Sequence, residues 1–503
     1  MPETMGSGCA FLDFDDDGNL DILLVNGKSW EDGKSDSTLK LYRNRGNGMF
    51  ADVTRAAKLD VPMYGMGVSV ADYDNDGDVD IYFTNLKSNR LFRNNGDRTF
   101  TDVTAAAKVG DAGWSTSATF FDYDRDGWLD LFVCNYVQWA IETNIPCTVD
   151  EQHLSYCTPS VYPGQSSRLY RNSGNGSFED VTERAGIYNP SGKSLGVTLL
   201  DYDDDGWLDL AVANDTEPNF LYHNNGDGTF TDEALVMGIA FDESGRVRGS
   251  MGIDAADVYN DGGLAIAIGN FSNEMTAFFY AKPDDYFADL ASRAKIGNAS
   301  LISLTFGLFF FDFDLDRYAD VFYVNGHIEP NIGLYQQIVE YAQPPSLFWN
   351  QHDGTFTEIG SQVGLGKPGV GRGVAYGDYD NDGDLDLLIS NNGVKTGYGK
   401  AWLLRNDGGN RNNYLRVKTV GVKSNRDGIG AKVILKAGDL TQRQMVRTGS
   451  SYCSQSETTL TFGLGQSEIV ESLEVIWPSG KIDRYANLQA NRLIKVTEGE
   501  TGK

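Results

Sequence analysis

Short apolar segments alternate with polar turns along most of the chain, and they repeat as a unit of four β-type segments. Each unit begins with a run of small residues, as at 67–71, and continues into an acidic loop. A second segment is apolar and ends in asparagine, a third carries an aromatic-Arg-Asn turn as at 91–94, and a fourth opens with phenylalanine as at 50–54. Apolar segments this short, separated by turn signals, predict strands rather than helices.

The acidic loop occurs seven times and defines the repeat. Its first aspartates are Asp13, Asp72, Asp122, Asp201, Asp257, Asp312 and Asp378. Four short strands and their turns occupy about 40–50 residues, which is the length of a propeller blade. Small residues on the first strand suit the crowded axis of such a fold. We therefore expect an all-β chain whose main part is a seven-bladed β-propeller.

The loop at residues 72–80 shows what this pattern can bind. Aspartates stand at its positions 1, 3, 5 and 9, and Gly77 at position 6 permits a sharp turn. Position 7 can add a backbone carbonyl, and Ca²⁺ takes six to eight oxygen ligands. The seventh-position residue is included in the expected ligand sets, which are Asp13, Asp15, Asp17, Asn19 and Asp21; Asp72, Asp74, Asp76, Asp78 and Asp80; Asp122, Asp124, Asp126, Trp128 and Asp130; Asp201, Asp203, Asp205, Trp207 and Asp209; Asp312, Asp314, Asp316, Tyr318 and Asp320; and Asp378, Asp380, Asp382, Asp384 and Asp386.

Two of the seven loops depart from the pattern. The fifth loop has Tyr259 at position 3 and Ala265 at position 9, so we expect no calcium there. The sixth has Arg317 where glycine belongs, which places an arginine in a glycine-like conformation and predicts a weakened site. We therefore expect five or six calcium ions. Because each loop joins two strands of a blade, their role is predicted to be structural.

Composition and charge narrow the classes of partner. The formal net charge is −29, with 71 acidic against 42 basic residues, which argues against nucleic acid because its binders are basic. The chain has no apolar run of the length that a transmembrane helix needs. We expect a monomer without a membrane-spanning segment.

Several motifs together carry a resemblance to a known family. The acidic loops and the aromatic-Arg-Asn turns resemble FG-GAP/VCBS repeats, which also form the integrin α-subunit propeller. Three later motifs, at 426–431, 462–465 and 477–480, resemble the ASPIC/UnbV domain. The whole chain is similar to the cartilage acidic protein family. The resemblance implies a propeller at 1–409 and a β-sandwich-like ASPIC/UnbV domain at 410–503, with the calcium loops on one face and ligands on the other.

An insertion at about 136–165 interrupts the repeats. The similar insertion in the family carries a cysteine pair, which implies a disulfide between Cys147 and Cys157 and an oxidising compartment. Two free thiols in a surface loop are the alternative. The resemblance thus favours a secreted, periplasmic or cell-surface protein.

The seventh blade of the propeller is predicted to lack its fourth strand. The seventh unit has no phenylalanine segment after 402–408, and family members supply that strand from an N-terminal segment. Here the chain begins just inside the first blade, without the basic start and apolar segment of a signal peptide. We therefore expect a three-stranded seventh blade and a chain that lacks its native N-terminus.

The loops after the seven strand-ending asparagines are the most variable, so they are where function can differ. The asparagines themselves are predicted to cap turns. Glu217, Glu274, His327 and Glu329 are candidates for a site at the channel mouth, with Lys28, Lys87, Arg248 and Arg372 as candidates for holding an anion. If they converge, they suit acid–base chemistry, in an enzyme of natural-product or carbohydrate metabolism; a lectin is a further alternative. A solvated rim of ordinary turn carboxylates is the simpler interpretation. We favour a calcium-binding scaffold that recognises a protein or glycan.

Overall fold

The propeller is a closed ring of seven sheets. The computed structural model describes residues 1–27, 38–148, 153–283, 285–393 and 397–500. In the part of the ring that the structure describes, six sheets have four antiparallel strands and one has three, and the first strand of each sheet contacts the first strand of the next. The contact between β1 and β27 closes the ring, so the predicted fold class is confirmed.

Each blade runs from the axis outwards in chain order. The first strands are β1 (Cys9–Leu12), β5 (Gly65–Ala71), β9 (Ser115–Phe121), β15 (Ser194–Leu200), β19 (Ile253–Ala256), β23 (Thr305–Phe311) and β27 (Gly371–Gly377). The second strands are β2 (Asp21–Leu24), β6 (Asp80–Asn85), β10 (Asp130–Asn135), β16 (Asp209–Asn214), β20 (Leu264–Ile268), β24 (Asp320–Asn325) and β28 (Asp386–Asn391). The third strands are β3 (Lys40–Asn44), β7 (Arg90–Asn94), β13 (Arg168–Asn172), β17 (Phe220–Asn224), β21 (Ala277–Ala281), β25 (Ser346–Asn350) and β29 (Trp402–Leu404). The fourth strands are β4 (Phe50–Asp52), β8 (Phe100–Asp102), β14 (Phe178–Asp180), β18 (Phe230–Asp232), β22 (Ala288–Asp289) and β26 (Phe356–Glu358). In the described part of the chain the seventh blade thus has three strands, as expected.

Helices are few and short. They are α1 (Pro2–Met5), α2 (Thr104–Ala107), α3 (Ala234–Met237) and α4 (Gly297–Ser300), with 3₁₀ turns η1 (Ile141–Thr143), η2 (Pro159–Val161), η3 (Ile332–Leu334) and η4 (Gly409–Arg411). Among the residues that the structure describes, none of these helices has the length and apolar character to cross a membrane.

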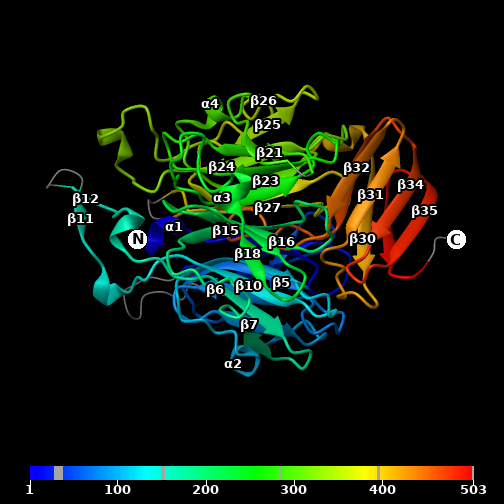
Figure 1. Ribbon diagram of the computed structural model, residues 1–503, viewed down its shortest axis with the longest axis horizontal. Helices are drawn as coiled ribbons and strands as arrows, with labels where there is room; N and C mark the ends of the chain where they lie inside the picture. The colour runs from blue at the N-terminus through cyan, green and yellow to red at the C-terminus, as the bar shows by residue number, and fades with distance from the viewer. Residues whose placement is uncertain (28–37, 149–152, 284, 394–396, 501–503) are drawn as a thin grey trace.

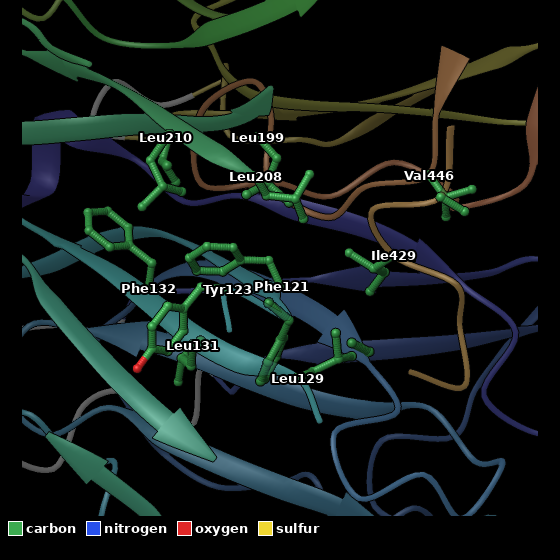
Figure 2. Close-up of a cluster of buried hydrophobic side chains, with 14 of the residues drawn as sticks. Phe121, Tyr123, Leu129, Leu131, Phe132, Leu199, Leu208, Leu210, Ile429 and Val446 are labelled. Carbon is green, nitrogen blue, oxygen red and sulfur yellow. The ribbon is translucent and has the colours of Figure 1, made fainter. Parts of the chain in front are cut away.

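The C-terminal part forms two further sheets at one end of the molecule (Figure 1). One contains β33 (Leu460–Gly465), β30 (Asn413–Val420) and β36 (Arg492–Thr497), and the other β32 (Leu440–Met445), β31 (Lys432–Ala437), β34 (Ile469–Ile476) and β35 (Ile482–Gln489). The apolar core continues from blades three and four into this part. Figure 2 shows Leu208 of blade four beside Ile429 and Val446 of the C-terminal part, and all three belong to one buried cluster.

The link between β32 and β33 occupies the channel of the propeller. We call residues 446–457 the channel segment. Its backbone pairs with that of blade one, where Gln455 N–H donates to Cys9 O at 3.0 Å, and with that of blade five, where Ser451 N–H donates to Ile253 O at 2.8 Å. Further bonds reach blades two, three and seven. The C-terminal part is therefore threaded into the propeller rather than tethered beside it.

The opposite mouth of the channel is covered by the N-terminal segment and the insertion. Tyr452 at the tip of the channel segment donates its hydroxyl to Met5 O of α1 at 3.1 Å. The insertion contains β11 (Cys147–Thr148) and β12 (Leu154–Ser155), and it lies with α1 at the end of the molecule away from the C-terminal sheets (Figure 1). The expected disulfide between Cys147 and Cys157 is confirmed.

Candidate metal centres and the opposite rim

The seven acidic loops share one face of the propeller, because each joins the first strand of a blade to the second. In the second loop the carboxylate of Asp72 closes the turn: Oδ1 accepts Asp76 N–H at 3.0 Å and Oδ2 accepts Gly77 N–H at 2.7 Å. Gly77 has φ of 101°, which confirms the glycine-dependent turn that the sequence predicts. The same pair of bonds closes six of the seven loops.

The ninth-position aspartates anchor the loops to the sheets. Asp80 is buried and accepts the N–H groups of Tyr73 at 3.2 Å and Asn94 at 2.8 Å. The side chain of Asn94 then donates to Phe14 O of the preceding blade at 2.9 Å. An asparagine in this position bonds to the preceding blade six times, at Asn44, Asn94, Asn172, Asn224, Asn350 and Asn406. In the fifth blade Ala281 ends the third strand, and its methyl group cannot donate.

The third-position aspartates provide the best test of a cation site. Each has a buried Oδ1 without a hydrogen-bond partner in five loops, at Asp15, Asp74, Asp124, Asp314 and Asp380. A buried carboxylate oxygen without a partner is costly unless a cation compensates it. In loops one and three an arginine already contacts the other oxygen of this carboxylate, with Arg43 2.6 Å from Asp15 Oδ2 and Arg171 2.6 Å from Asp124 Oδ2. Carboxylate oxygens also gather within 4.8 Å of one another in the sets Asp13, Asp15 and Asp17; Asp72, Asp74 and Asp80; Asp122, Asp124 and Asp130; and Asp201, Asp203 and Asp205. The sets of loops one, two and three fit a hard divalent cation such as Ca²⁺.

Burial raises the pKa values of several first- and ninth-position aspartates. The pKa rises to about 7 for Asp72 and Asp122, and to about 8 for Asp21 and Asp386. In each case burial is the largest cause, and neighbouring carboxylates add to it. Without a bound cation, Asp21 and Asp386 therefore favour the protonated form at neutral pH, and Asp72 and Asp122 are partly protonated.

Position 7 is held in one orientation throughout. Its backbone N–H donates to the fifth-position carboxylate, at Asn19, Asp78, Trp128, Trp207, Tyr318 and Asp384. The fifth-position carboxylates that accept these bonds belong to Asp17, Asp76, Asp126, Asp205, Asp316 and Asp382.

Loop five departs from the regular loops in its side-chain contacts, whereas loop six closes as they do. Arg317 adopts φ of 90° and its N–H still closes the sixth loop on Asp312 at 2.8 Å. In the fifth loop, Asp261 accepts the hydroxyl of Tyr280 at 2.7 Å and pairs with Lys282 at 3.2 Å. Protein side chains thus neutralise the carboxylate of the fifth loop, whereas the sixth keeps the geometry of the regular loops.

The C-terminal part covers the face that carries the acidic loops. Arg416 of β30 contacts Asp378 of the seventh loop at 2.8 Å and Glu457 at 2.5 Å, and all three are buried. Asp427 accepts Asp72 N–H at 2.8 Å, and Arg443 lies 3.6 Å from Asp257. A cavity of about 820 Å³ remains between β31, β32 and loops four to six.

On the opposite face, the strand-ending asparagines cap turns, as predicted. Asn85 Nδ2 donates to Ser88 O at 3.1 Å, and Asn214 Nδ2 donates to Pro218 O at 2.7 Å. The side chains of the other five also bond within their own blades or loops, at Asn26, Asn135, Asn270, Asn325 and Asn391.

The rim candidates fall into two groups in the described contacts. Glu217 pairs with the buried Lys193 at 3.0 Å, and Glu274 accepts Gly249 N–H at 2.8 Å. Both flank Asp215, whose pKa burial raises to about 6 and whose carboxylate accepts the Tyr136 hydroxyl at 2.6 Å. Asp215 belongs to this group, but the sequence alone does not indicate it. Asp215 directly follows a strand-ending asparagine, as an ordinary turn residue does.

The second group surrounds His327, which is buried with its ring 5.3 Å from that of Phe271. Burial lowers its pKa to about 4, and Nδ1 accepts Glu329 N–H at 3.0 Å. Glu329 itself accepts the hydroxyl of Ser155 in the insertion at 3.0 Å. In the described contacts, Glu217 and Glu274 therefore share no side-chain partner with His327 and Glu329.

The two arginines among the cationic candidates are engaged elsewhere. Arg372 is buried and donates only to carbonyls in the described contacts, including Thr4 O at 2.8 Å. Arg248 lies between Asp242 at 3.6 Å and Asp289 at 3.3 Å. Lys87 sits in a turn with φ of 88°, and Lys28 is outside the described residues.

Comparisons with known proteins agree with the repeat pattern. The family model "FG-GAP-like repeat" matches residues 13–83, 72–133, 160–212, 201–268 and 312–389, and the model "ASPIC and UnbV" matches 421–503. Cartilage acidic protein 1 of Homo sapiens is 28% identical over 324 residues, covering 61% of this chain and 44% of that protein. The Mus musculus protein is 30% identical over 322 residues, covering 61% and 45%. The chain thus spans less than half the length of these relatives.

Two solved structures that resemble this chain have lower sequence identity to it than these relatives. A lectin of Agrocybe aegerita, titled for recognition of non-reducing terminal N-acetylglucosamine, is 17% identical, covers 80% of this chain and 94% of its own, and has a TM-score of 0.42. The BP39L lectin of Burkholderia pseudomallei is 9% identical, covers 80% and 97%, and has a TM-score of 0.49. Both scores lie below 0.5, so neither bears on function here.

Proposed function

Since the chain belongs to the family of FG-GAP-like repeat proteins with an ASPIC and UnbV domain, we propose that it is a calcium-stabilised recognition scaffold. The observation that carries this proposal is the buried, unpartnered Oδ1 of the third-position aspartate in loops one, two, three, six and seven. When bound, Ca²⁺ supplies positive charge to these carboxylates. The chain's own aspartates and glycine turns hold the oxygens in place.

The recognition surface is proposed to be the face away from the acidic loops. The C-terminal part covers the acidic-loop face through Arg416, Asp427 and Arg443. On the other face, Leu334 and Ile338 are exposed at 66% and 71% of their surface. Exposed apolar side chains of this kind favour a protein partner over a glycan. The disulfide supports an extracytoplasmic setting, because such bonds persist in oxidising compartments.

Thermal unfolding with calcium and with EGTA tests the scaffold. Each ion present at 100 times its dissociation constant stabilises the fold by about 2.7 kcal/mol, so several ions raise the melting temperature by many degrees. Asp76→Ala should lower the calcium-dependent part of this shift. The matched control Asp261→Ala should not, because Tyr280 and Lys282 already neutralise Asp261. A melting temperature that is the same in calcium and EGTA would contradict the proposal.

The recognition surface has its own test. An array of extracellular proteins and glycans can be probed with the wild-type chain and with the double variant Leu334→Asp, Ile338→Asp. We expect the double variant to lose the protein ligands that the wild type retains. Leu235→Asp is the control, because Leu235 is also exposed, at 73%, but lies on α3 at the outer side of blade four. Loss of binding in the control alone would place the surface elsewhere.

A further inference from the structure

The fourth acidic loop does not close as the other six do. Its sequence is regular, and the carboxylate oxygens of Asp201, Asp203 and Asp205 lie within 4.8 Å of one another. In the other loops the first aspartate accepts the N–H groups of the fifth and sixth residues, as Asp72 does from Asp76 and Gly77. Neither oxygen of Asp201 accepts a hydrogen bond of this kind, and both are buried.

One N–H group of the fourth loop is turned to another acceptor. Asp205 N–H donates to Asp203 Oδ1 at 3.3 Å instead of to Asp201. The loop thus presents the carboxylate of its first aspartate outwards from the turn, towards the C-terminal part.

A lysine of the C-terminal part meets that carboxylate. Lys432, the first residue of β31, places Nζ 2.5 Å from Asp201 Oδ2 and 2.5 Å from Asp204 Oδ1. Asp201 has only 2% of its side chain exposed, so the ammonium group provides the positive charge that this buried carboxylate needs. An ammonium group is a compact point charge with three donors, which suits two carboxylates at once.

The seventh loop shows that a cation from the C-terminal part need not disturb the turn. Arg416 contacts Asp378 at 2.8 Å, yet Asp378 still accepts the N–H groups of Asp382 and Gly383, each at 3.1 Å. Arg416 also pairs with Glu457 at 2.5 Å, which shares its charge. In the described contacts Lys432 has no acidic partner outside the fourth loop.

We propose that Lys432 takes the place of the metal ion in blade four, so that this loop fixes the C-terminal part to the propeller without calcium. The inference rests on the proposed calcium binding of the regular loops and assigns one regular-looking loop to a different role. A divalent cation bound at Asp201 would lie next to the ammonium group and be repelled by it, because like charges at such distances repel strongly in a partly buried site.

The number of calcium ions bound per chain tests the proposal, measured by equilibrium dialysis with ⁴⁵Ca²⁺. Lys432→Met removes the charge and keeps an apolar stem, so the variant should bind one more ion than the wild type. Lys436→Met is the matched control on the same strand, since Lys436 is exposed. It should bind the wild-type number. The cavity of about 820 Å³ that borders Asp201 and Lys432 gives calcium access to the loop in the variant.

A second pair of variants does not depend on how well Lys432→Met folds. Asp201→Asn should leave the wild-type calcium number unchanged, whereas Asp72→Asn should lower it by one. An unchanged number in Lys432→Met, or a loss of one ion in Asp201→Asn, would overturn the role of Lys432 and leave calcium binding elsewhere intact. A wild-type chain that binds no calcium would instead refute the proposed function itself.

Discussion

The bonds between neighbouring blades predict a large effect of one buried asparagine. Asn172 ends β13 and is 1% exposed. Its Nδ2 donates to Tyr73 O of blade two at 2.9 Å and to Leu129 O at 3.0 Å, and its Oδ1 accepts Gly174 N–H at 3.0 Å. Asn172→Ala removes all three bonds while the backbone of the strand stays.

The expected cost follows from the number of bonds and their burial. Each bond contributes about 1 kcal/mol net, and a buried carbonyl left without a partner costs about 1–3 kcal/mol. We therefore expect a loss of about 3–5 kcal/mol in the free energy of unfolding. At about 2.1 cal/mol/K of unfolding entropy per residue, a chain of 503 residues that unfolds as one unit loses about 1 °C per kcal/mol. The melting temperature should fall by about 3–5 °C.

Differential scanning calorimetry in saturating calcium measures this change. Asn175→Ala is the matched control, because Asn175 is exposed in the same turn and accepts only the local N–H and hydroxyl of Ser177. It should shift the melting temperature by less than about 1 °C. If the two variants melt together, the bonds between blades do not stabilise the ring as argued.

Further predictions concern the channel, the disulfide and pH. Gly8→Ala should prevent the channel segment from packing in the channel, because the new methyl group would lie 1.6 Å from Cys453 O. The soluble yield and the far-UV circular dichroism signal should therefore fall. The control Gly366→Ala should stay near wild type, because no atom lies within 4 Å of its new methyl group. The double variant Cys147→Ser, Cys157→Ser should destabilise the insertion locally by roughly 2–3 kcal/mol, visible as faster trypsin cleavage there but little change in global melting. In calcium-free buffer the stability should be highest at acidic pH and fall as pH rises from about 4 to about 8, because the folded pKa values of Asp21, Asp72, Asp122 and Asp386 lie above their unfolded values of about 3.9. Saturating calcium should abolish this fall, and a calcium-free profile that rises over the same range would contradict the pKa shifts.

The repeat and its turns can be predicted from the sequence because they depend on interactions between residues of the same blade. A glycine at position 6 and aspartates two residues apart form their bonds within a few residues, and a strand-ending asparagine bonds within its own blade or loop. Gly77 and Asn85 therefore behave as their neighbours in the chain dictate. Even the unusual backbone of Arg317 follows from its place in the loop.

Contacts between residues far apart in the chain cannot be predicted from such local patterns. The channel segment is rich in small polar residues such as Ser451 and Ser454, which are typical of an ordinary linker. Only the ring of strand edges around it reveals that its backbone is paired. Lys432 gives no signal either, since a lysine at the start of a strand is common on surfaces, and its partner Asp201 is more than two hundred residues away. Blade order alone places the four rim candidates together. Side-chain packing instead separates Glu217 and Glu274 from His327 and Glu329.

The calcium content of the wild-type chain tests the central claim most directly. Protein dialysed against micromolar calcium and then analysed by inductively coupled plasma mass spectrometry should hold about five calcium ions per chain, one for each loop with an unpartnered third-position oxygen. Lowering the buffer calcium with EGTA should remove them. A chain that retains no calcium under these conditions, while remaining folded, would contradict the account.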